Sequence, residues 1–361
     1  MPPRPRPRPR PPVLLVAVIL MGCDHTEPFL PAPYGSPPPP AAAQVRLTYN
    51  LGQDQSPAWL PSGGGFFYGR QRLDRADHDW CLALMPADGG AIRREICDVL
   101  PAAADSTDAW RLPGPGPGGR LAYVRSTAYA PLGSIAPYRT ELVVGTLSDP
   151  ARGGVLKVLP GQAPSGRSYD MASQIRWLGP SSIVYLAERV AYERACGSCP
   201  VDTLRWGQEI VKADWGGPVP VFAMLPGSDQ ASSVAVAGSD TVYYTSNGDS
   251  RVYRLVLSTD AITVVHDFGL AGIARDVQVA GGRLVAVVGG SVSFENDPLI
   301  GPVQRDGGGT LYLVSLATGA RQALTSGVEL FRHPALSPAG DRLVAEMITG
   351  GSSDIWAVRL P

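Results

Sequence analysis

The sequence has little net charge and no long apolar run. Its 31 Lys and Arg side chains are balanced by 32 Asp and Glu, which gives a net charge of −1 at pH 7. A protein that binds nucleic acid through the phosphate backbone needs a basic patch, so the composition predicts no nucleic-acid partner. The apolar run Val13–Met21 is far shorter than the ~20 residues that a membrane-spanning helix needs. A helical membrane protein is therefore disfavoured.

The chain also lacks the signals of a serine hydrolase of the α/β class. Such an enzyme needs a G-x-S-x-G turn for its nucleophile, followed in the sequence by an acid and a histidine. No G-x-S-x-G occurs, and the four histidines are His25, His78, His266 and His333. We therefore do not expect a peptidase of this class.

What the sequence does contain begins with a targeting segment. Residues 1–12 carry four arginines and no acid, and Val13–Met21 is followed by Gly22 and Cys23. A basic start, a short apolar core and a small residue before a cleavage point are typical of a secretory signal. Leu20-Met21-Gly22-Cys23 resembles the lipobox of bacterial lipoproteins, in which the cysteine receives a diacylglyceryl group and becomes the N-terminus. This resemblance implies a signal peptide over residues 1–22 and lipidation at Cys23. An ordinary signal with an incidental cysteine is the alternative.

The segment after the signal peptide is a predicted tether. Residues 23–43 are rich in proline and alanine and show neither helical nor strand periodicity. Proline favours the extended polyproline II conformation. We expect a semi-rigid spacer that holds residues 44–361 at a bacterial membrane, on the periplasmic or surface side of the cell envelope.

A strand followed by a polar turn recurs through residues 44–361. The segments with this pattern are His78–Gly90, Arg139–Gly154, Trp206–Gly217, Ser250–Asp260, Gly309–Gly319 and Ser353–Leu360. Most of them lead into another short alternating strand, which is the signature of a hairpin. Another pair of strands precedes each hairpin, in Ser56–Arg70, Thr107–Ser126, Ser173–Glu188, Ser232–Ser246, Arg275–Gly289 and Arg332–Met347. The repeating unit therefore has four strands and occurs six times, at a spacing of about fifty residues. This predicts an all-β fold, a six-bladed β-propeller around a central channel.

The last unit resembles a known repeat. Ala335–Leu360 is similar to the PD40, WD40-like repeat of TolB-type propellers, in which a Ser-Pro-Asp-Gly turn precedes a strand and then an Ile-Trp strand. Ser337–Gly340 keeps the turn without its Asp, and Ser56-Pro57 with Trp59–Gly63 is a second match. The resemblance implies a TolB-like propeller, and it carries no catalytic residue.

The ends of this domain predict how the ring closes. The sixth unit supplies only the strands Pro334–Leu336, Arg342–Met347 and Asp354–Leu360. Gln44–Leu51 reads as one extra strand at the other end. Adding it to the last blade pairs an edge that would otherwise be a template for aggregation. We expect the N-terminal strand to close the last blade, so that the six blades use residues 44–361 and leave no room for a hydrolase domain.

Four cysteines remain besides Cys23. Cys81 and Cys97 flank a hairpin turn nearly symmetrically, and an exported chain with an even number of cysteines favours disulfides. We predict that they are within bonding distance of each other. Cys196-x-x-Cys199 could be a redox pair or half of a zinc site. A redox pair is expected in a βαβ context, and a zinc site needs a second close pair of ligands; the sequence shows neither. A disulfide that staples its loop is therefore preferred, and no metal or other cofactor is predicted.

The starts of the innermost strands are expected to line one mouth of the channel. Aligning the units places these residues there: Ser56, Thr107, Gln174, Ser233, Asp276 and His333, with Arg275 and Arg332 beside two of them. Asp276 and His333 could act as acid and base or as metal ligands. Calcium-dependent propeller lactonases use several acidic and amide side chains in this ring, whereas one carboxylate makes a poor calcium site. A solvated polar tunnel is the alternative to a binding site.

Three insertions are long and carry aromatic residues: Tyr129–Tyr138, Ala191–Trp206 and Ser291–Asp306. Loops of this length in a compact fold often have a function, and these would suit recognition of a protein or peptide.

Together these features suggest a monomeric lipoprotein of the cell envelope. Its propeller would be a non-catalytic module that binds or scaffolds an envelope protein or peptide at the channel mouth or the long loops, as the resemblance to TolB-like proteins implies. The alternative is an enzyme that uses the channel, either a lactonase-like hydrolase or a glutaminyl cyclase-like transferase. Propellers host many functions, so the fold does not decide between them.

Overall fold

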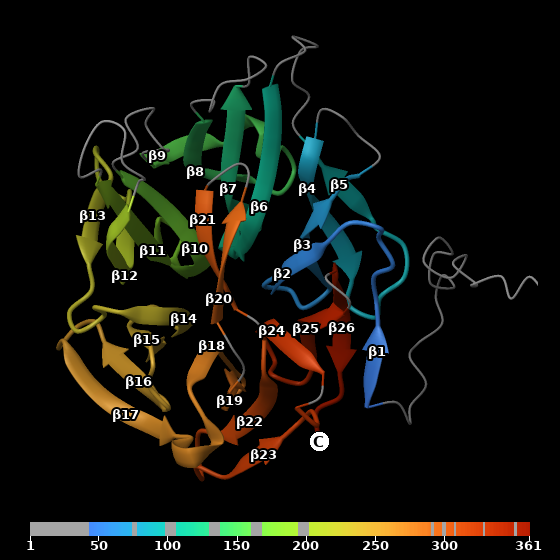
Figure 1. Ribbon diagram of the computed structural model, residues 1–361, viewed down its shortest axis with the longest axis vertical. Coiled ribbons are helices and arrows are strands. Elements are labelled where there is room, and N and C mark those ends of the chain that lie inside the picture. Colours follow the sequence, from blue (N-terminus) through green and yellow to red (C-terminus); the bar gives the residue numbers. More distant parts are fainter. Residues whose placement is uncertain are drawn as a thin grey trace, which may run out of the picture.

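The chain forms a ring of six four-stranded blades around a central channel (Figure 1). The structure, a computed structural model, describes residues 43–73, 78–97, 106–129, 138–159, 168–193, 202–289, 292–297, 301–306, 308–327, 329–349 and 352–361. The predicted signal peptide, Cys23, most of the tether, Cys196 and Cys199 lie outside these residues. The predicted six-bladed β-propeller is confirmed.

Each blade runs from an inner strand at the channel to an outer strand at the rim, with antiparallel neighbours. Blade 1 contains β2 (Asp54–Trp59), β3 (Gly65–Gln71), β4 (His78–Pro86) and β5 (Arg94–Ile96). Blade 2 contains β6 (Ser106–Gly116), β7 (Arg120–Tyr129), β8 (Tyr138–Thr146) and β9 (Gly154–Leu159). Blade 3 contains β10 (Ser168–Gly179), β11 (Ser182–Glu193), β12 (Asp202–Asp214) and β13 (Val221–Met224).

The second half of the ring repeats this order. Blade 4 contains β14 (Ala231–Ala237), β15 (Thr241–Ser246), β16 (Arg251–Val256) and β17 (Ala261–Asp267). Blade 5 contains β18 (Ala274–Ala280), β19 (Arg283–Val288), β22 (Thr310–Ser315) and β23 (Arg321–Ala323). Blade 6 contains β24 (Leu330–Leu336), β25 (Leu343–Thr349), β26 (Ser352–Val358) and β1 (Gln44–Arg46). Short 3-10 helices occupy three of the described connections: η2 (Pro117–Gly119), η3 (Pro150–Arg152) and η4 (Gly269–Ala271).

The ring closes through the N-terminal strand, as predicted. β1 pairs antiparallel with β26, with Gln44 opposite Val358 and Arg46 opposite Trp356. Beyond the short strand, the Thr48 hydroxyl accepts a hydrogen bond from the Ile355 amide at 2.9 Å. The outer edge of β26 is therefore paired by a segment from the other end of the propeller.

Blades 1 and 2 are joined more closely than their neighbours. β4 pairs in parallel with the start of β6, where Trp80 lies opposite Ala109. This pairing merges the two blades into one eight-stranded sheet.

The hydrophobic core is divided among the junctions between blades. Six clusters of buried side chains each combine residues from two adjacent blades. Phe67 and Leu82 of blade 1 pack with Trp110 and Leu121 of blade 2, for example. The inner strands of a blade are covered on both faces, so they contain nearly continuous apolar runs such as Arg283–Val288, whose last five residues are buried.

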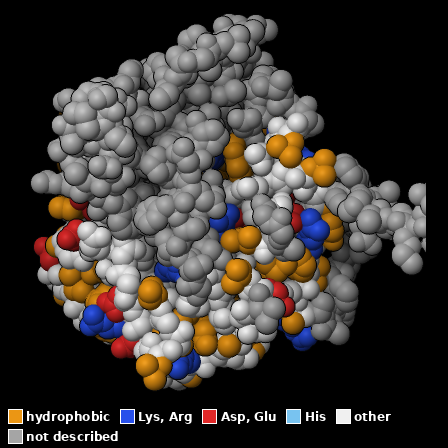
Figure 2. Space-filling view, viewed as in Figure 1, with side chains coloured by type: hydrophobic (Ala, Val, Ile, Leu, Met, Phe, Trp, Pro, Cys, Tyr) orange, Lys and Arg blue, Asp and Glu red, His pale blue; other side chains and the backbone are white. Residues whose placement is uncertain are grey.

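The insertion expected as a loop at Ser291–Asp306 contains a hairpin. β20 (Val292–Asp297) and β21 (Gly301–Asp306) pair only with each other and separate β19 from β22. In the view of Figure 1 this hairpin crosses the centre of the ring. The insertion at Ala191–Trp206 is also more regular than expected, because β11 and β12 stay paired as far as Glu193 and Asp202. Figure 2 shows the same face in space-filling form, with side chains of both charges on it.

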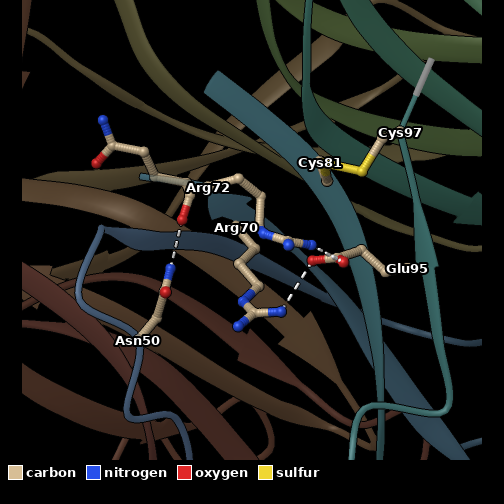
Figure 3. Close-up of a disulfide and its surroundings, with 7 residues drawn as sticks. Asn50, Arg70, Arg72, Cys81, Glu95 and Cys97 are labelled. Carbon is tan, nitrogen blue, oxygen red and sulfur yellow. Dashed lines mark hydrogen bonds and ion pairs between the residues drawn. A yellow bond between two sulfur atoms is a disulfide. The ribbon is translucent and has the colours of Figure 1, made fainter. Parts of the chain in front are cut away.

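A disulfide joins the last two strands of blade 1 (Figure 3). Cys81 lies on β4 and Cys97 directly after β5, with their Cα atoms 4.7 Å apart. This bond was predicted from the hairpin symmetry and is confirmed. Beside it, Glu95 accepts hydrogen bonds from Arg70, at 2.9 Å, and from Arg72 (Figure 3).

Candidate functional site

Each inner strand is irregular where it lines the channel. Its pairing with the second strand skips a residue, between Gln55 and Ala58 in blade 1 and between Ser173 and Arg176 in blade 3, for example. In five blades the bulge contains a residue with positive φ: Ser56 (52°), Leu112 (55°), Gln174 (50°), Asp276 (48°) and His333 (45°). Bulges redirect side chains, and non-glycine residues with positive φ are uncommon. The five residues occupy equivalent positions in their blades and together form a ring of bulges around the channel. We call this set of positions, with Ser233 of blade 4, the ring.

Five of the residues predicted for the channel lie in this ring: Ser56, Gln174, Ser233, Asp276 and His333. Ser233 differs from the other four, because its bulge follows Ala231 and Ser233 itself has no positive φ.

Thr107 was misplaced by the sequence alignment. Its backbone pairs with Ala128 near the start of β6, and Leu112 occupies the position equivalent to Ser56. Pairing Thr107 with Ser56 would place Trp110, three residues later, at the position of Trp59, but Trp110 is fully buried and stacks on Tyr123 within the blade. β6 is longer than β2, and the bulge comes later in it.

Hydrogen bonds from backbone amides to side chains connect four of the six blades to the next blade. Gln174 of blade 3 accepts from the Val234 amide of blade 4 at 2.8 Å. Ser233 of blade 4 accepts from the Val277 amide of blade 5 at 3.1 Å.

The series continues across the next two junctions. Asp276 of blade 5 accepts from the His333 amide of blade 6 at 2.9 Å. Glu346 of blade 6 accepts from the Ser56 amide of blade 1 at 3.3 Å. Four consecutive junctions are thus linked in the same way.

Blade 2 interrupts this series. The Leu112 side chain has no acceptor atom, and the next residue, Pro113, has no amide hydrogen to donate. The junction to blade 3 is apolar instead: the Trp177 ring covers Gly116, and the Trp177 indole donates to the Gly114 carbonyl at 2.7 Å. A Cβ atom on Gly116 would lie 2.3 Å from this ring, so only glycine fits.

Glu346 is the most deeply buried charge of the channel, and the sequence analysis missed it. It is fully buried on β25. Arg332 donates to one of its oxygens at 2.5 Å, and Nδ1 of His333 lies 2.8 Å from the other. The one signal in the sequence is that Glu346 is the single acid in the otherwise apolar stretch Leu343–Ile348.

The charges of this cluster depend on one another. Burial alone would raise the pKa of Glu346, but the charge of Arg332 and the hydrogen bond from His333 outweigh it and lower the pKa to about 2. Burial would lower the pKa of His333, but Asp276 and Glu346 outweigh it and raise this pKa above its ordinary value. Glu346 is therefore ionised at neutral pH.

A hydrogen bond also crosses the channel. The Gln174 amide donates to one oxygen of Asp276 at 3.0 Å, while the other oxygen serves the His333 amide. Both oxygens of Asp276 are thus occupied in holding blades 3, 5 and 6 together. Arg275 is buried and donates to the Gly289 carbonyl.

Two cavities adjoin the ring. The smaller one, of about 60 Å³, contacts Ser56, Leu112, Gln174, Arg176, Asp276 and His333. The larger one, of about 640 Å³, lies among the last residues of the inner strands and the turns that follow them, and we call it the vestibule. Its lining is mainly apolar and includes Trp59, Trp177 and six prolines: Pro57, Pro61, Pro115, Pro117, Pro180 and Pro338. The sequence analysis expected the binding mouth of the channel at the starts of the inner strands. The vestibule opens on the opposite face, at the ends of these strands.

Two negative findings concern the described residues alone. Within them, no group of three or more His, Cys, Asp or Glu side chains is arranged to hold a metal ion. In the same part of the chain, no helix is long and apolar enough to span a lipid bilayer.

Comparisons with known proteins find similar backbones at low identity. No family model and no curated protein matches the sequence. TolB from Acinetobacter baumannii is 13% identical, over 85% of this chain and 63% of that chain, with a TM-score of 0.45. A luciferin-regenerating enzyme is 13% identical, over 88% of this chain and 95% of that chain, with a TM-score of 0.48. A protein described as a putative gluconolactonase is 12% identical, over 91% and 97%, with a TM-score of 0.47.

Proposed function

We propose that this chain is a lipid-anchored protein of the bacterial cell envelope whose propeller binds a peptide segment of a partner protein in the vestibule, without catalysing a reaction. The observation that carries the proposal is the vestibule itself. Its volume, about 640 Å³, falls within the ~300–1,000 Å³ typical of ligand sites. Aromatic and proline rings supply rigid apolar walls, which suit an extended peptide.

The polar ring supports a structural role for the channel residues. Asp276, Ser233 and Glu346 each accept a hydrogen bond from the backbone of the next blade. Groups that are engaged in this way maintain the shape of the channel, and the vestibule walls remain available for binding.

The anchor is proposed from the sequence. Cys23 would carry the lipid, and residues 24–43 would form the spacer between the membrane and the propeller. Replacing Cys23 by Ser should move the protein from the membrane fraction to the soluble fraction and abolish labelling by radioactive palmitate. Retention in the membrane fraction after this change would contradict the anchor.

Binding can be tested by filling the vestibule. Ser239 is exposed and lines it, so Ser239→Trp should block the cavity without disturbing the core. Crosslinking in intact cells should yield a partner adduct with the wild type that is lost with Ser239→Trp. Ala317→Trp, in an exposed turn at the rim between β22 and β23, is the matched control and should keep the adduct. Loss of the adduct in both variants, or in neither, would contradict a vestibule site.

One observation favours an enzyme as the second candidate. His333 and Glu346 form an acid–base pair at 2.8 Å, and Ser56 lines the same small cavity as His333. Such a pair can activate a hydroxyl group. A lactonase-like or glutaminyl cyclase-like activity would appear as turnover of a panel of lactones, esters and glutaminyl peptides that is lost in His333→Ala. Absence of turnover in the wild type would remove this candidate.

A further inference from the structure

The vestibule contains an arginine that forms no ion pair with any described residue. Arg176 lies on β10 and lines both the vestibule and the small cavity. Its one hydrogen bond within the described chain runs from a terminal nitrogen to the Ile175 carbonyl, at 3.0 Å. Its Nε atom is buried and has no acceptor there. Burial lowers the pKa of Arg176 to about 10, against the opposing effect of Asp276, so the side chain is charged at neutral pH.

The contrast with Arg332 shows what is unusual. Arg332 is buried in the channel and forms an ion pair with Glu346. Arg176 forms no ion pair with a described carboxylate, and both oxygens of Asp276 already accept other hydrogen bonds. The Arg176 residue as a whole is half-buried. A charge that is partly removed from water without a partner carries a free-energy cost, and an external anion would offset that cost.

The shape of the site indicates which part of the ligand carries the negative charge. Arg176 lies where the vestibule meets the small cavity. A cavity of about 60 Å³ holds a few water molecules at most. A peptide that points from the vestibule into the small cavity therefore has no room to continue past Arg176. The end of a peptide that pairs with a guanidinium is its C-terminal carboxylate, and Arg binds carboxylates through two parallel hydrogen bonds.

We propose that Arg176 binds the C-terminal carboxylate of a peptide whose apolar residues occupy the proline- and tryptophan-lined vestibule. This inference rests on the proposed function, because it names the group by which the same site would recognise its ligand. Trp59 and Trp177 donate their indole hydrogens to the backbone carbonyls of Ala335 and Gly114. Their rings are thereby fixed, and they contact the ligand only through apolar surface.

The test compares two pools of peptides that differ in one group. Fluorescein-labelled pentapeptides of Pro, Leu and Tyr are synthesised as a mixture, once with a free C-terminal carboxylate and once as C-terminal amides. Binding to the full chain is followed by fluorescence anisotropy. We expect the acids to bind at least tenfold more tightly than the amides. Arg176→Gln should abolish this preference, and Arg176→Lys should retain part of it.

Arg254→Gln is the matched control. It removes the same charge from an exposed position on β16, and it should keep the full preference for the acid. Thermal unfolding without peptide supplies a second readout: Arg176→Gln should melt at the same temperature as the wild type or higher, because it removes a half-buried charge that has no ion-pair partner among the described residues. A lower melting temperature would assign Arg176 a structural role and overturn the inference.

The outcomes separate the inference from the proposed function. Equal binding of acids and amides, sensitive to Ser239→Trp, would overturn the role of Arg176 and leave the vestibule as a peptide site. If neither pool binds, the melting temperature is measured with benzoate and with its neutral counterpart benzamide. Stabilisation by benzoate alone, lost in Arg176→Gln, would support the anion site and contradict the peptide. No stabilisation by benzoate would overturn both.

Discussion

Two kinds of contact join neighbouring blades at the channel. The four junctions from blade 3 round to blade 1 are made by polar side chains, whereas the two junctions of blade 2 are not. From blade 3 round to blade 1, a polar side chain of one blade accepts a hydrogen bond from the inner-strand backbone of the next blade. At the equivalent place blade 2 has Leu112 and Pro113. It is joined to blade 1 by a parallel strand pair and to blade 3 by Trp177 packed on Gly116.

This difference shows which property of a blade junction is required. A bulge in the inner strand leaves backbone amides without a partner, and buried amides need one. An acceptor from the neighbouring blade is one solution, and a proline that has no amide is another. The inner strand keeps its bulge in both cases. A junction therefore requires that no buried backbone amide lacks a hydrogen-bond acceptor, and it does not require any particular side chain.

The largest expected effect comes from removing the centre of the polar series. Glu346→Ala deletes the carboxylate that binds Arg332, His333 and the Ser56 amide. Breaking a buried ion pair by removing one partner costs about 3–5 kcal/mol, and we expect a loss of this size in the free energy of unfolding. Denaturation in urea measures it. Glu329→Ala removes an exposed acid bound to Ser326 and should change stability little; similar losses in the two variants would contradict the central role of Glu346.

The apolar junction can be tested at Gly116. Its backbone is extended, with φ −127° and ψ 176°, so Gly116→Ala introduces no backbone strain and only brings a methyl group against the Trp177 ring. We expect a loss of about 2–3 kcal/mol, the upper part of the range for overpacking. Gly154→Ala is the control, because nothing lies within 4 Å of the added Cβ. Equal stability of the two variants in urea would show that blade 2 can move away from blade 3.

Acid should weaken the polar junctions selectively. Glu346 has an ordinary pKa of 4.5 that is lowered to about 2 in the folded protein, so its contribution to stability is present above pH 4.5 and is lost as the pH falls towards 2. Linkage predicts a loss of about 2 kcal/mol between pH 7 and pH 3 from this group. His333 acts in the opposite direction: its raised pKa stabilises the fold below its ordinary pKa of 6.5, and this contribution is lost as the pH rises through the folded value. Glu346→Gln should flatten the acid limb of a plot of unfolding free energy against pH; an unchanged limb would assign the acid sensitivity to other groups.

The smallest expected effect comes from comparing two serines of the channel. Ser233 of blade 4 accepts from the Val277 amide, whereas the Ser56 hydroxyl of blade 1 forms no hydrogen bond within the described residues. Ser233→Ala should cost about 1–2 kcal/mol, because a buried amide loses its acceptor. Ser56→Ala should stay within about 0.5 kcal/mol of the wild type. Guanidinium denaturation of both variants measures the difference, and equal effects would show that the series of acceptors adds no stability.

Much of the fold could be predicted because its signals are local. Alternation identifies strands such as Arg251–Val256, and the turns between them mark the hairpins. The symmetry of Cys81 and Cys97 about one turn was sufficient to pair them. The channel was harder to predict, since aligning blade 2 on Trp110 selected Thr107 instead of Leu112. The local pattern there resembles the other blades, while the position of the bulge depends on how β6 packs between its neighbours.

The sequence by itself determined the repeat of six four-stranded units and the return of the N-terminal strand to the last blade, because strand periodicity and an incomplete final unit are visible along the chain. Only the tertiary structure decided which groups meet in the channel. Glu346 and the Ser56 amide are 290 residues apart in sequence and form a hydrogen bond. Both oxygens of Asp276, from another blade than Arg176, are engaged by other donors. Such contacts form when the ring closes, and no local pattern in the sequence records them.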